Sequence, residues 1–576
     1  MSLTRVSQSM IGYNGVTSIT TNTTITEDLY IGSGQIFNVS GGATLTFSGA
    51  FDAGLYQIFT GTGEVKFDIG SVSRVCPEWW GAVNDGVADC APAINSAIRS
   101  GTLCNGIPVH LNSGGTYGLG SPIFITSIGV TLIGATPVYS TIGPLAVDIS
   151  VGGGSNAMIV NKVQPTNCKI QNIRFSENGL NFNGWCISGN VGEPDTELNF
   201  SSLYIQECWI ALSAAASQGF FRGGFVDAHF EANQFEFTKG SCFKLGDAVG
   251  GFWLDNAVSQ TSFGTFINAT TKATGSNTVK GLIAQDNKSD FLIKLSNATN
   301  WHISDITVIQ NPYLPGVGGY YPGILSVDTC TNIIFTNFTS ITAGNASKGI
   351  EIAASQIIIS NGQVITDDVM VINHNPFNIS GVDNDIIIDN IFVSGVGNNL
   401  RGQITIADNT AGHLRVNNST FDKSAASFLV TGATAVSLNF EFNGNRITNC
   451  NYNGPSLHQM FDVVTSGYTR ILNNVIGVTD ILSTPVSIYR FLGAGDLIQG
   501  GNTILGLGGG SEVATGSVKT PSYIGANFNG ASYRTDAATP VGAVAPLFLG
   551  EMFYQSTGDK WFKSYGLTNT SWTILN

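Results

Sequence analysis

Asparagine recurs between short apolar runs in the second half of the chain, and successive members of the series are 24 to 29 residues apart. A repeated interval of this size is typical of a solenoid in which each repeat forms one coil. After glycine, asparagine most readily adopts the left-handed backbone conformation of a tight bend. One such bend in each coil would explain why asparagine recurs and not another polar residue. The series comprises Asn337, Asn361, Asn390, Asn418, Asn445, Asn474 and Asn502.

Weaker members of the series lie upstream, and they place the start of the coils near residue 100. We therefore expect residues 76–510 to form the solenoid and to carry the catalytic or receptor-binding site. Residues 1–75 are rich in Thr, Gly and Ile, and we expect them to form short β-strands that cap the first coil. The upstream members are Asn172, Cys208 in place of an asparagine, Asn233, Asn256 and Asn287.

Residues 511–576 have a different pattern. Apolar residues alternate with polar ones in 548–554 and 560–563, on either side of the turn residues 557–559, and this pattern predicts a β-hairpin with Trp572 close behind it. An open end of a coil stack exposes unpaired strands and apolar surface. A capping or oligomerising element is therefore required at that end.

Composition narrows the class of partner. Only 11% of residues are charged and 71 are Gly, which suits stacked coils with an apolar interior and small polar residues outside. The formal charge of −14 argues against nucleic acid or an anionic membrane as a partner. No apolar run is long enough to span a membrane. The nine cysteines contain no C-x-x-C pair, and we expect neither a metal site nor a cofactor.

A compound motif lies where the solenoid is expected to begin. Residues 80–89, WGAVNDGVAD, form a turn rich in Gly and Asp, and the segment after them has apolar residues at helical spacing. A strand–turn–strand pattern follows, with PVHLNSGGTY at 108–117. This order resembles the start of pectate-lyase-like right-handed parallel β-helices, although Cys90 stands where that family usually has a second Asp or Thr. We expect Asp85 and Asp89 to cap turns and to take no part in chemistry.

The terminal pattern F-L-G-E-x-F-Y…G-x-K-W-F, together with this motif and the repeated asparagines, resembles bacteriophage tailspikes. The resemblance implies an all-β, right-handed parallel β-helix with an N-terminal β cap and a C-terminal β trimerisation element. It implies a homotrimer in the phage virion that depolymerises capsular or O-antigen polysaccharide at the bacterial surface. No segment resembles the usual virion-binding region, so attachment to the tail is expected through a region not evident in this sequence.

Hydrolysis of a polysaccharide requires two carboxylates across the scissile bond. Neighbouring coils stack about 4.8 Å apart, so acids one coil apart would suit a retaining pair and acids two coils apart an inverting pair. Aligning the coils on the bend residue places Glu207, Asp255 and Asp286 in one outward column. Glu231 lies one position out of that register. The candidate catalytic residues, in order of preference, are Glu231, Asp255, Asp227, Glu207 and Asp286.

Histidines and aromatic residues in or next to the same coils are candidates for binding sugar. Imidazole groups can transfer protons or bind hydroxyl groups, and aromatic faces can stack on the C–H surfaces of sugars. Buried packing is the alternative role for each tryptophan, and a satisfied surface polar group is the alternative for each histidine. The candidates are His229, Trp253, Trp209, Trp301, His302, Tyr320 and Tyr321.

Two further functions stay open. A polysaccharide lyase would use a base with cationic help, either Lys, Arg or clustered Asp that binds Ca²⁺, and residues 200–310 hold scattered Lys and Arg but no obvious Asp cluster. A non-catalytic adhesin would bind glycan without changing its size. We favour an endo-acting glycoside hydrolase.

Overall fold

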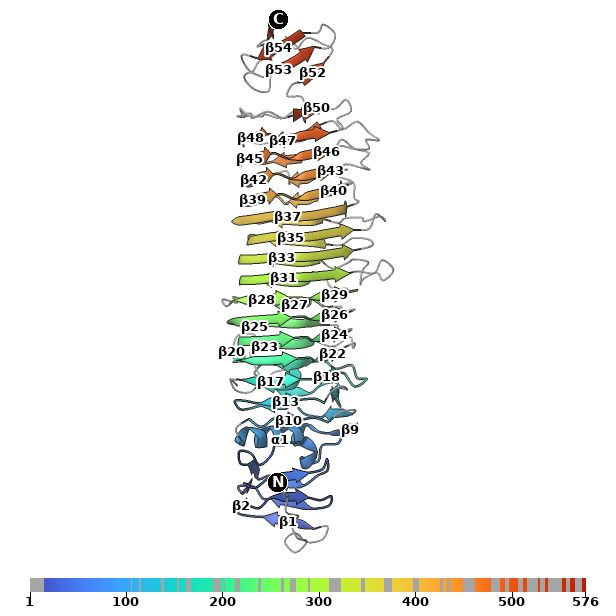
Figure 1. Cartoon of the computed structure of the whole chain (residues 1–576), viewed down its shortest axis with the longest axis vertical. Helices are drawn as coiled ribbons and strands as arrows, with labels where there is room; N and C mark the ends of the chain where they lie inside the picture. Colours follow the sequence, from blue (N-terminus) through green and yellow to red (C-terminus); the bar gives the residue numbers. More distant parts are fainter. Residues whose placement is uncertain are drawn as a thin grey trace. The chain divides into compact units, whose positions relative to one another are not determined.

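The computed structural model divides the chain into two compact units, Met1–His302 (unit 1) and Ile303–Asn576 (unit 2) (Figure 1). The described part of each consists mainly of β-strands, and it contains no helix long and apolar enough to cross a membrane. The structure describes residues 15–104, 106–112, 115–135, 139–152, 155–161, 167–189, 198–200, 202–212, 218–236, 240–260, 264–269, 276–287, 291–309, 323–342, 348–366, 375–396, 403–424, 428–431, 436–448, 461–477, 487–492, 497–505, 511–514, 527–528, 534–536, 552–555, 560–564 and 572–575.

The first strands of unit 1 form small parallel coils with a core of phenylalanine. The rings of Phe47 and Phe67 are at most 1% exposed and stack with their centroids 5.3 Å apart. The sequence predicts a cap of short strands here, and the described strands are themselves stacked in parallel. The sheets are β1 (Val16–Ile19), β4 (Ile36–Val39) and β7 (Phe59–Gly61); β2 (Thr23–Ile25), β5 (Thr44–Phe47) and β8 (Glu64–Phe67); and β3 (Leu29–Ile31) with β6 (Phe51–Ala53).

The acidic turn that follows is held by its own carboxylates. Oδ1 of Asp85 accepts hydrogen bonds from the backbone N–H groups two and three residues on, at 2.8 and 2.9 Å, and these bonds lower the pKa of Asp85. Oδ1 of Asp89 accepts the N–H of Ala91 at 3.0 Å and that of Gly120 at 2.9 Å. The predicted capping role is confirmed for both residues. Asp89, however, lies one position before the N-cap residue, Cys90, whose side chain makes no capping bond.

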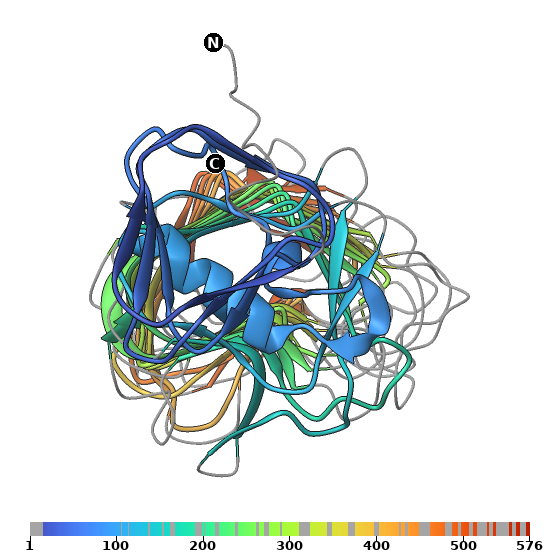
Figure 2. The same ribbon diagram turned by 90° about the horizontal axis from the view of Figure 1, so that it is seen from below.

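Helix α1 (Ala91–Leu103) follows η1 (Pro77–Trp80) and β9 (Asp85–Asp89). Its apolar residues Ile94 and Ile98 are buried, as their helical spacing predicts. The helix packs against η1, β8, β10 (Val109–His110) and β12 (Ile123–Ile125), and Figure 2 shows it lying across the ring of strands in unit 1. It thereby covers apolar side chains between the N-terminal coils and the main solenoid of this unit.

From β10 onward, the strands of unit 1 stack mainly in parallel, with one antiparallel pair, β15 (Ser150–Gly152) and β16 (Ser155–Asn161). From β17 onward, the coils turn at a residue with positive φ. These bends separate the strands on one side of the coil from those on the next. The strands before the bends are β17 (Cys168–Gln171), β21 (Leu203–Gln206), β23 (Gly219–Glu231), β25 (Ser241–Asp255) and β28 (Asn277–Lys280), and those after them are β18 (Ile173–Ser176), β22 (Trp209–Ala211), β24 (Gln234–Glu236), β26 (Val258–Gln260) and β29 (Ile283–Gln285). The bend residues are Asn172, Glu207, Ala232, Asn256 and Gly281, with φ between 51° and 68°.

Alternate residues of these strands point inward and stack in columns. One column consists of Ile170, Ile205, Phe230, Leu254 and Val279, which pair in register and are at most 1% exposed. Burying each such side chain contributes about 1.5–3 kcal/mol before the entropy of ordering is subtracted. The residues between them therefore point outward, which fixes the face on which candidate functional groups lie.

The described cysteines are buried and form no disulfide bonds. Burial raises the pKa of the Cys168 and Cys208 thiols to about 12. They therefore behave as small core side chains.

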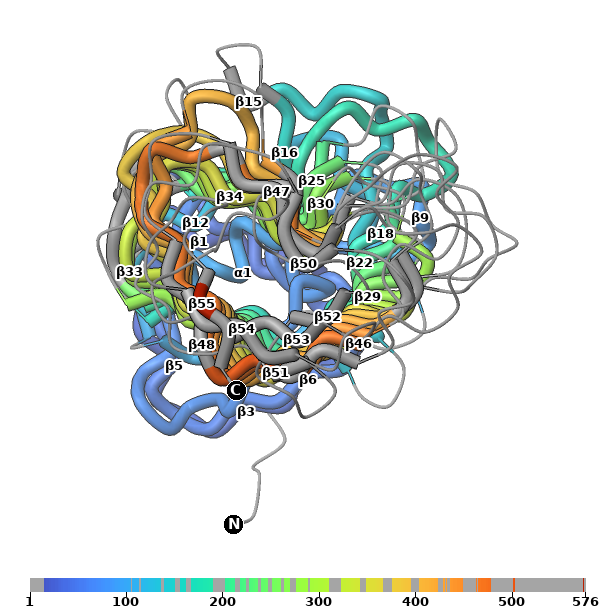
Figure 3. The backbone as a smooth tube through the Cα atoms, turned by 90° about the horizontal axis from the view of Figure 1, so that it is seen from above, coloured from blue at the N-terminus to red at the C-terminus, as the bar shows by residue number. Residues whose placement is uncertain are grey.

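In the first coils of unit 2 the bend lies inside long strands. β33 (Thr331–Thr342), β35 (Gln356–Thr366) and β37 (Asn384–Val396) each turn at an asparagine, namely Asn337, Asn361 and Asn390, with φ of 52–53°. Seen along the long axis, β33, β34 (Lys348–Ala353) and β46 (Val475–Gly477) lie on different sides of the coil (Figure 3). The left-handed role predicted for the repeated asparagines is confirmed in these coils.

The prediction is wrong for the last three members of the series. Asn445, Asn474 and Asn502 are at most 1% exposed, and in each coil the preceding residue (Gly444, Asn473 or Gly501) has the positive φ. Their side chains form a ladder inside the solenoid. Oδ1 of Asn474 accepts the backbone N–H of Asn445 at 2.8 Å, and Oδ1 of Asn502 accepts that of Asn474 at 2.9 Å. These asparagines satisfy buried backbone groups where two sides of the coil meet.

The C-terminal strands form a separate sheet within unit 2. β53 (Met552–Gln555) and β54 (Lys560–Ser564) pair antiparallel, which confirms the predicted hairpin, and β55 (Trp572–Leu575) adds to β54. β52 (Arg534–Asp536) completes the sheet. The predicted parallel β-helix with additional β-sheets is confirmed. The three predicted regions and the trimer remain predictions.

Candidate functional site

The outward face of β21, β23, β25 and β28 in unit 1 holds five of the residues singled out from the sequence, namely Asp227, His229, Glu231, Trp253 and Asp255. Strand pairing places their outward side chains in two vertical columns, two residues apart along each strand. The first contains Tyr204, His229, Trp253 and Thr278, and the second contains Gln206, Glu231, Asp255 and Lys280.

The first column is an aromatic ladder of Tyr204, His229 and Trp253. The Tyr204 and His229 rings stack with centroids 4.8 Å apart and an interplanar angle of 9°. The His229 and Trp253 rings stack at 4.3 Å and 8°. Both faces of the imidazole are therefore covered. A ligand approaching this face would contact ring edges, with the outer faces of Tyr204 and Trp253 at the two ends.

Gly251 makes room for this ladder. A Cβ atom added to Gly251 would lie 1.7 Å from Cη2 and 2.2 Å from Cζ3 of Trp253, so the indole ring lies across the glycine. Asp227 on β23 is the register partner of Gly251 on β25, and its side chain is partly buried. It shares the outward face but lies four residues before Glu231.

Glu231 and Asp255 form the acidic pair of the second column. They are direct partners in the parallel register of adjacent coils, and strands in such a stack are about 4.8 Å apart. Oε2 of Glu231 accepts a hydrogen bond from Nε2 of Gln206 at 2.7 Å, and Lys280 is the register partner of Asp255. The arrangement brings two carboxylates, one amide and one ammonium group into a single outward column, where proton transfer and contacts with hydroxyl groups are both chemically possible.

The register corrects the predicted column of acids. Glu231 and Asp255 occupy equivalent positions, and the equivalent residue on β21 is Gln206. Glu207 follows Gln206 and lies at the bend, with a φ of 51°. Oε2 of Glu207 accepts a hydrogen bond from Nε2 of Gln171 at 3.0 Å. Asp286 lies beyond β29, on the following side of the coil, because Gly281 occupies the bend there. Asp286 therefore does not belong to the column of Glu231 and Asp255.

Trp209 lies across the bend from the acidic pair, within a cluster of its own. The Arg174 guanidinium carbon is 4.2 Å from the indole centroid, and Tyr139 contacts the indole edge-on at 6.1 Å. Nε1 of Trp209 donates to Oε2 of Glu236 at 3.0 Å. These contacts occupy the indole N–H and cover one face of the ring, so Trp209 is placed less favourably for stacking on a sugar than the sequence suggests.

The remaining candidates do not join the ladder. Trp301 is 1% exposed and packs on Phe252 with ring centroids 5.7 Å apart, so it is a core residue. His302, the next residue, is exposed. Tyr320 and Tyr321 lie outside the described residues. Among the described residues, no group of three or more His, Cys, Asp or Glu is placed to bind a metal ion.

Sequence reasoning missed Tyr204, Gln206 and Lys280. The signal for the first two was the alternation in LYIQ at 203–206, which matches HFE at 229–231 and WLD at 253–255 once the inward residues Ile205, Phe230 and Leu254 are aligned. Aligning apolar residues, and not asparagines, recovers the register.

No protein-family model matches this chain, and no curated protein matches it in sequence. Several solved structures are similar to it. Tailspike protein 3 of bacteriophage CBA120 is 12% identical, with 87% of this chain and 68% of that chain covered at a TM-score of 0.37. The gp42 tailspike of Acinetobacter phage vb_AbaP_AS12 is 10% identical, with coverage of 88% and 82% and a TM-score of 0.37. The catalytic unit of the GH87 α-1,3-glucanase of Streptomyces thermodiastaticus is 12% identical, with coverage of 80% and 68% and a TM-score of 0.28. The likeness is one of fold alone.

Proposed function

We propose that this chain binds and depolymerises a bacterial surface polysaccharide, capsular or O-antigen, by endo-acting glycosidic hydrolysis. The observation that carries the proposal is the placement of Glu231 and Asp255 as direct partners on adjacent coils, beside the ladder of Tyr204, His229 and Trp253. One carboxyl group would protonate the leaving oxygen while the other attacks as a nucleophile or activates water. The ring edges of the ladder would position the sugar chain.

The spacing of the pair favours retention of configuration. Carboxyl groups of retaining glycosidases are about 5–5.5 Å apart, and those of inverting enzymes about 6.5–9.5 Å. Adjacent coils repeat at about 4.8 Å, close to the shorter separation. Gln206 donates a hydrogen bond to Glu231, and Lys280 is the register partner of Asp255, so each acid has one polar neighbour in its column.

The biological setting that we propose is a phage tailspike, a homotrimer of the virion that acts at the bacterial surface. This part of the proposal is supported by the sequence motif at residues 80–98 and by the terminal hairpin pattern, which resemble those of tailspikes.

One observation favours a second activity. Lys280 is the register partner of Asp255, so a cation lies beside an acid, as a polysaccharide lyase requires. A lyase would abstract a proton next to a uronate carboxylate and release an unsaturated sugar.

The experiment incubates the full chain with purified capsular and O-antigen polysaccharides from several strains. Size-exclusion chromatography, mass spectrometry and ultraviolet absorbance of the products then separate the possibilities. Hydrolysis predicts shorter chains that each gain one water, without new absorbance. A lyase predicts unsaturated ends that absorb. Unchanged polymer size in every sample, with binding retained, would leave only an adhesin.

A further inference from the structure

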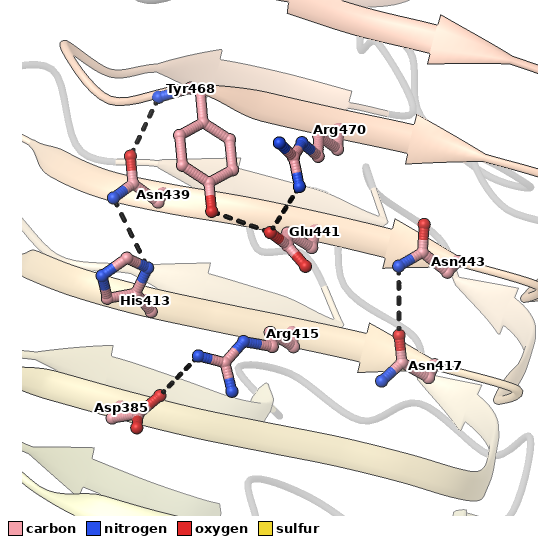
Figure 4. Close-up of polar contacts among 9 residues, drawn as sticks. All are labelled: Asp385, His413, Arg415, Asn417, Asn439, Glu441, Asn443, Tyr468 and Arg470. Atoms are coloured by element: carbon pink, nitrogen blue, oxygen red, sulfur yellow. Dashed lines mark hydrogen bonds and ion pairs between the residues drawn. The ribbon is translucent and has the colours of Figure 1, made fainter.

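A second polar surface lies in unit 2, on the outward side of β37, β39 (Ala411–Asn417), β42 (Ser437–Asn443) and β45 (Thr469–Leu472) (Figure 4). We call it the β39–β45 face. Strand pairing places its side chains in adjacent columns, as on the candidate site of unit 1. Its residues are Asp385, His413, Asn439 and Tyr468 in one column, Arg415, Glu441 and Arg470 in the next, and Asn417 and Asn443 in a third.

Glu441 is the centre of this face. Its Oε1 accepts the Tyr468 hydroxyl at 2.7 Å and Nη1 of Arg470 at 3.2 Å, and the Arg470 guanidinium carbon lies 4.9 Å from the centroid of the Tyr468 ring. The hydrogen bond to Glu441 raises the pKa of Tyr468. In Figure 4 the second carboxylate oxygen of Glu441 points away from both donors, toward the strands below. Three side chains are thus held in one arrangement.

A second ion pair and a contact between an amide and an imidazole extend the arrangement. Nη2 of Arg415 lies 3.3 Å from Oδ1 of Asp385. Nδ2 of Asn439 and Nδ1 of His413 lie 3.5 Å apart, and Oδ1 of Asn439 accepts the backbone N–H of Tyr468 at 3.0 Å. The four coils extend over about 14 Å at the usual strand spacing, which is long enough for a short oligosaccharide.

Stability alone does not explain these charges. Exposed ion pairs contribute about 0–1 kcal/mol each, and here the side chains of Arg470 and Asp385 are 46% and 50% exposed. In the preceding coils the column that holds Arg415 consists of Ile358 and Ile387, so the fold accepts an aliphatic residue at this position. The change from isoleucine to an Arg–Glu–Arg column therefore calls for a functional explanation.

The chemistry of the face points to a ligand rich in hydroxyl groups. The two arginines balance two carboxylates at close range, so the face lacks the excess positive charge that a polyanion requires. Planar guanidinium, carboxylate and amide groups held in fixed positions can contact neighbouring hydroxyl groups in pairs. Because the side chains are already ordered by each other, little entropy is lost when a ligand binds.

We infer that the β39–β45 face is a second, non-catalytic carbohydrate-binding surface, which takes an uncharged, hydroxyl-rich stretch of polysaccharide. Catalysis is not expected here because Glu441 has an arginine, and not a second acid, as its partner on both adjacent coils. The inference rests on the proposed function only for the choice of polysaccharide as probe.

The test measures binding by the full chain carrying Glu231→Gln, which prevents cleavage during the assay. The probes are purified neutral capsular polysaccharides, and the readout is Kd by biolayer interferometry with the thermal unfolding temperature as a check on folding. Arg470→Met should weaken binding roughly tenfold or more, as expected for the loss of charge-assisted hydrogen bonds. Arg446→Met is the matched control, because Arg446 is an exposed arginine on the next side of the coil that holds Glu441, and this change should leave Kd unchanged.

A separate titration checks the network itself. Glu441→Gln should lower the pKa of Tyr468 toward 10, measured by ultraviolet absorbance of the phenolate, and should weaken binding as Arg470→Met does.

Each outcome decides the inference. Loss of affinity in Arg470→Met and Glu441→Gln but not in Arg446→Met supports it, as does a Kd that is insensitive to salt. An unchanged Kd in Arg470→Met and Glu441→Gln, the absence of any binding, or a Kd that rises steeply with salt overturns it. If the unsubstituted chain binds these polysaccharides through this face but cleaves none of them, the proposed hydrolase fails while this inference stands.

Discussion

Adding one methyl group at Gly251 displaces Trp253 without touching either acid of the candidate site. The new Cβ would lie 1.7 Å from the indole, so the ring cannot keep its 4.3 Å stack on His229 in Gly251→Ala. An aromatic pair of this kind contributes about 0.5–1.5 kcal/mol. If ligand binding requires the ladder to re-form, affinity for polysaccharide should fall by about 2- to 13-fold.

The assay measures Kd in the Glu231→Gln background, with tryptophan fluorescence to show that the indole has moved. Gly362→Ala is the matched control, since its added Cβ would lie 2.1 Å from the ring of Phe338, which is 2% exposed. That change should cost about 1–3 kcal/mol of stability through overpacking and leave Kd unchanged. A wild-type Kd in Gly251→Ala, together with a shifted fluorescence spectrum, would refute the view that the ladder binds the ligand.

Three further predictions concern the fold. Asn474→Ala removes the hydrogen-bond partners of the Asn445 N–H and the Phe442 carbonyl, so the denaturation midpoint should fall by the equivalent of about 2–6 kcal/mol. Asn473→Gly at the adjacent bend should change the midpoint little. Equal midpoints for the two variants would contradict the buried ladder. The N–H groups of Ala88 and then Val87 lower the pKa of Asp85, so the carboxylate stabilises the turn at pH values above its unfolded pKa of 3.8. This stabilisation is lost as the pH falls through the lower pKa of the folded state. A carboxyl titration by NMR with a midpoint at or above 3.8 would contradict this. Deletion of 543–576 should abolish the trimer or lower the thermal unfolding temperature, as measured by light scattering and calorimetry, and a stable, active monomer would count against a tailspike.

The fold was predictable because each coil needs a bend that few residues tolerate. Asn337, Asn361 and Asn390 have the left-handed conformation that their spacing suggests. Asn474 and Asn502 recur at the same interval for another reason, since they bond buried backbone inside the coil. Sequence alone does not separate the two roles, because a shift of one residue along a bend turns a side chain from solvent into the core.

The sequence identifies the candidate acids by residue type, but it does not give their register between neighbouring coils. Aligning Asn233 and Asn256 as equivalent bend residues puts Glu231 and Asp255 one position out of line, whereas the strands pair them directly. In the structure Ala232 is equivalent to Asn256, since both have a φ of 52° and each donates its backbone N–H to the corresponding strand of the next coil. The pairing of inward apolar residues determines the register, and the outward residues follow from it.

The pair Glu231 and Asp255 is the centre of the proposed function, and its most direct test is the rate of polysaccharide cleavage by Glu231→Gln and Asp255→Asn. Both changes keep the shape of the side chain, so folding should persist, as circular dichroism and the unfolding temperature would show. Each single variant should lower the turnover rate by roughly 10²–10⁴, and the double variant should lose little more than the worse single one, because paired groups act as a unit. Cleavage at close to the wild-type rate by both single variants would contradict the assignment of this site.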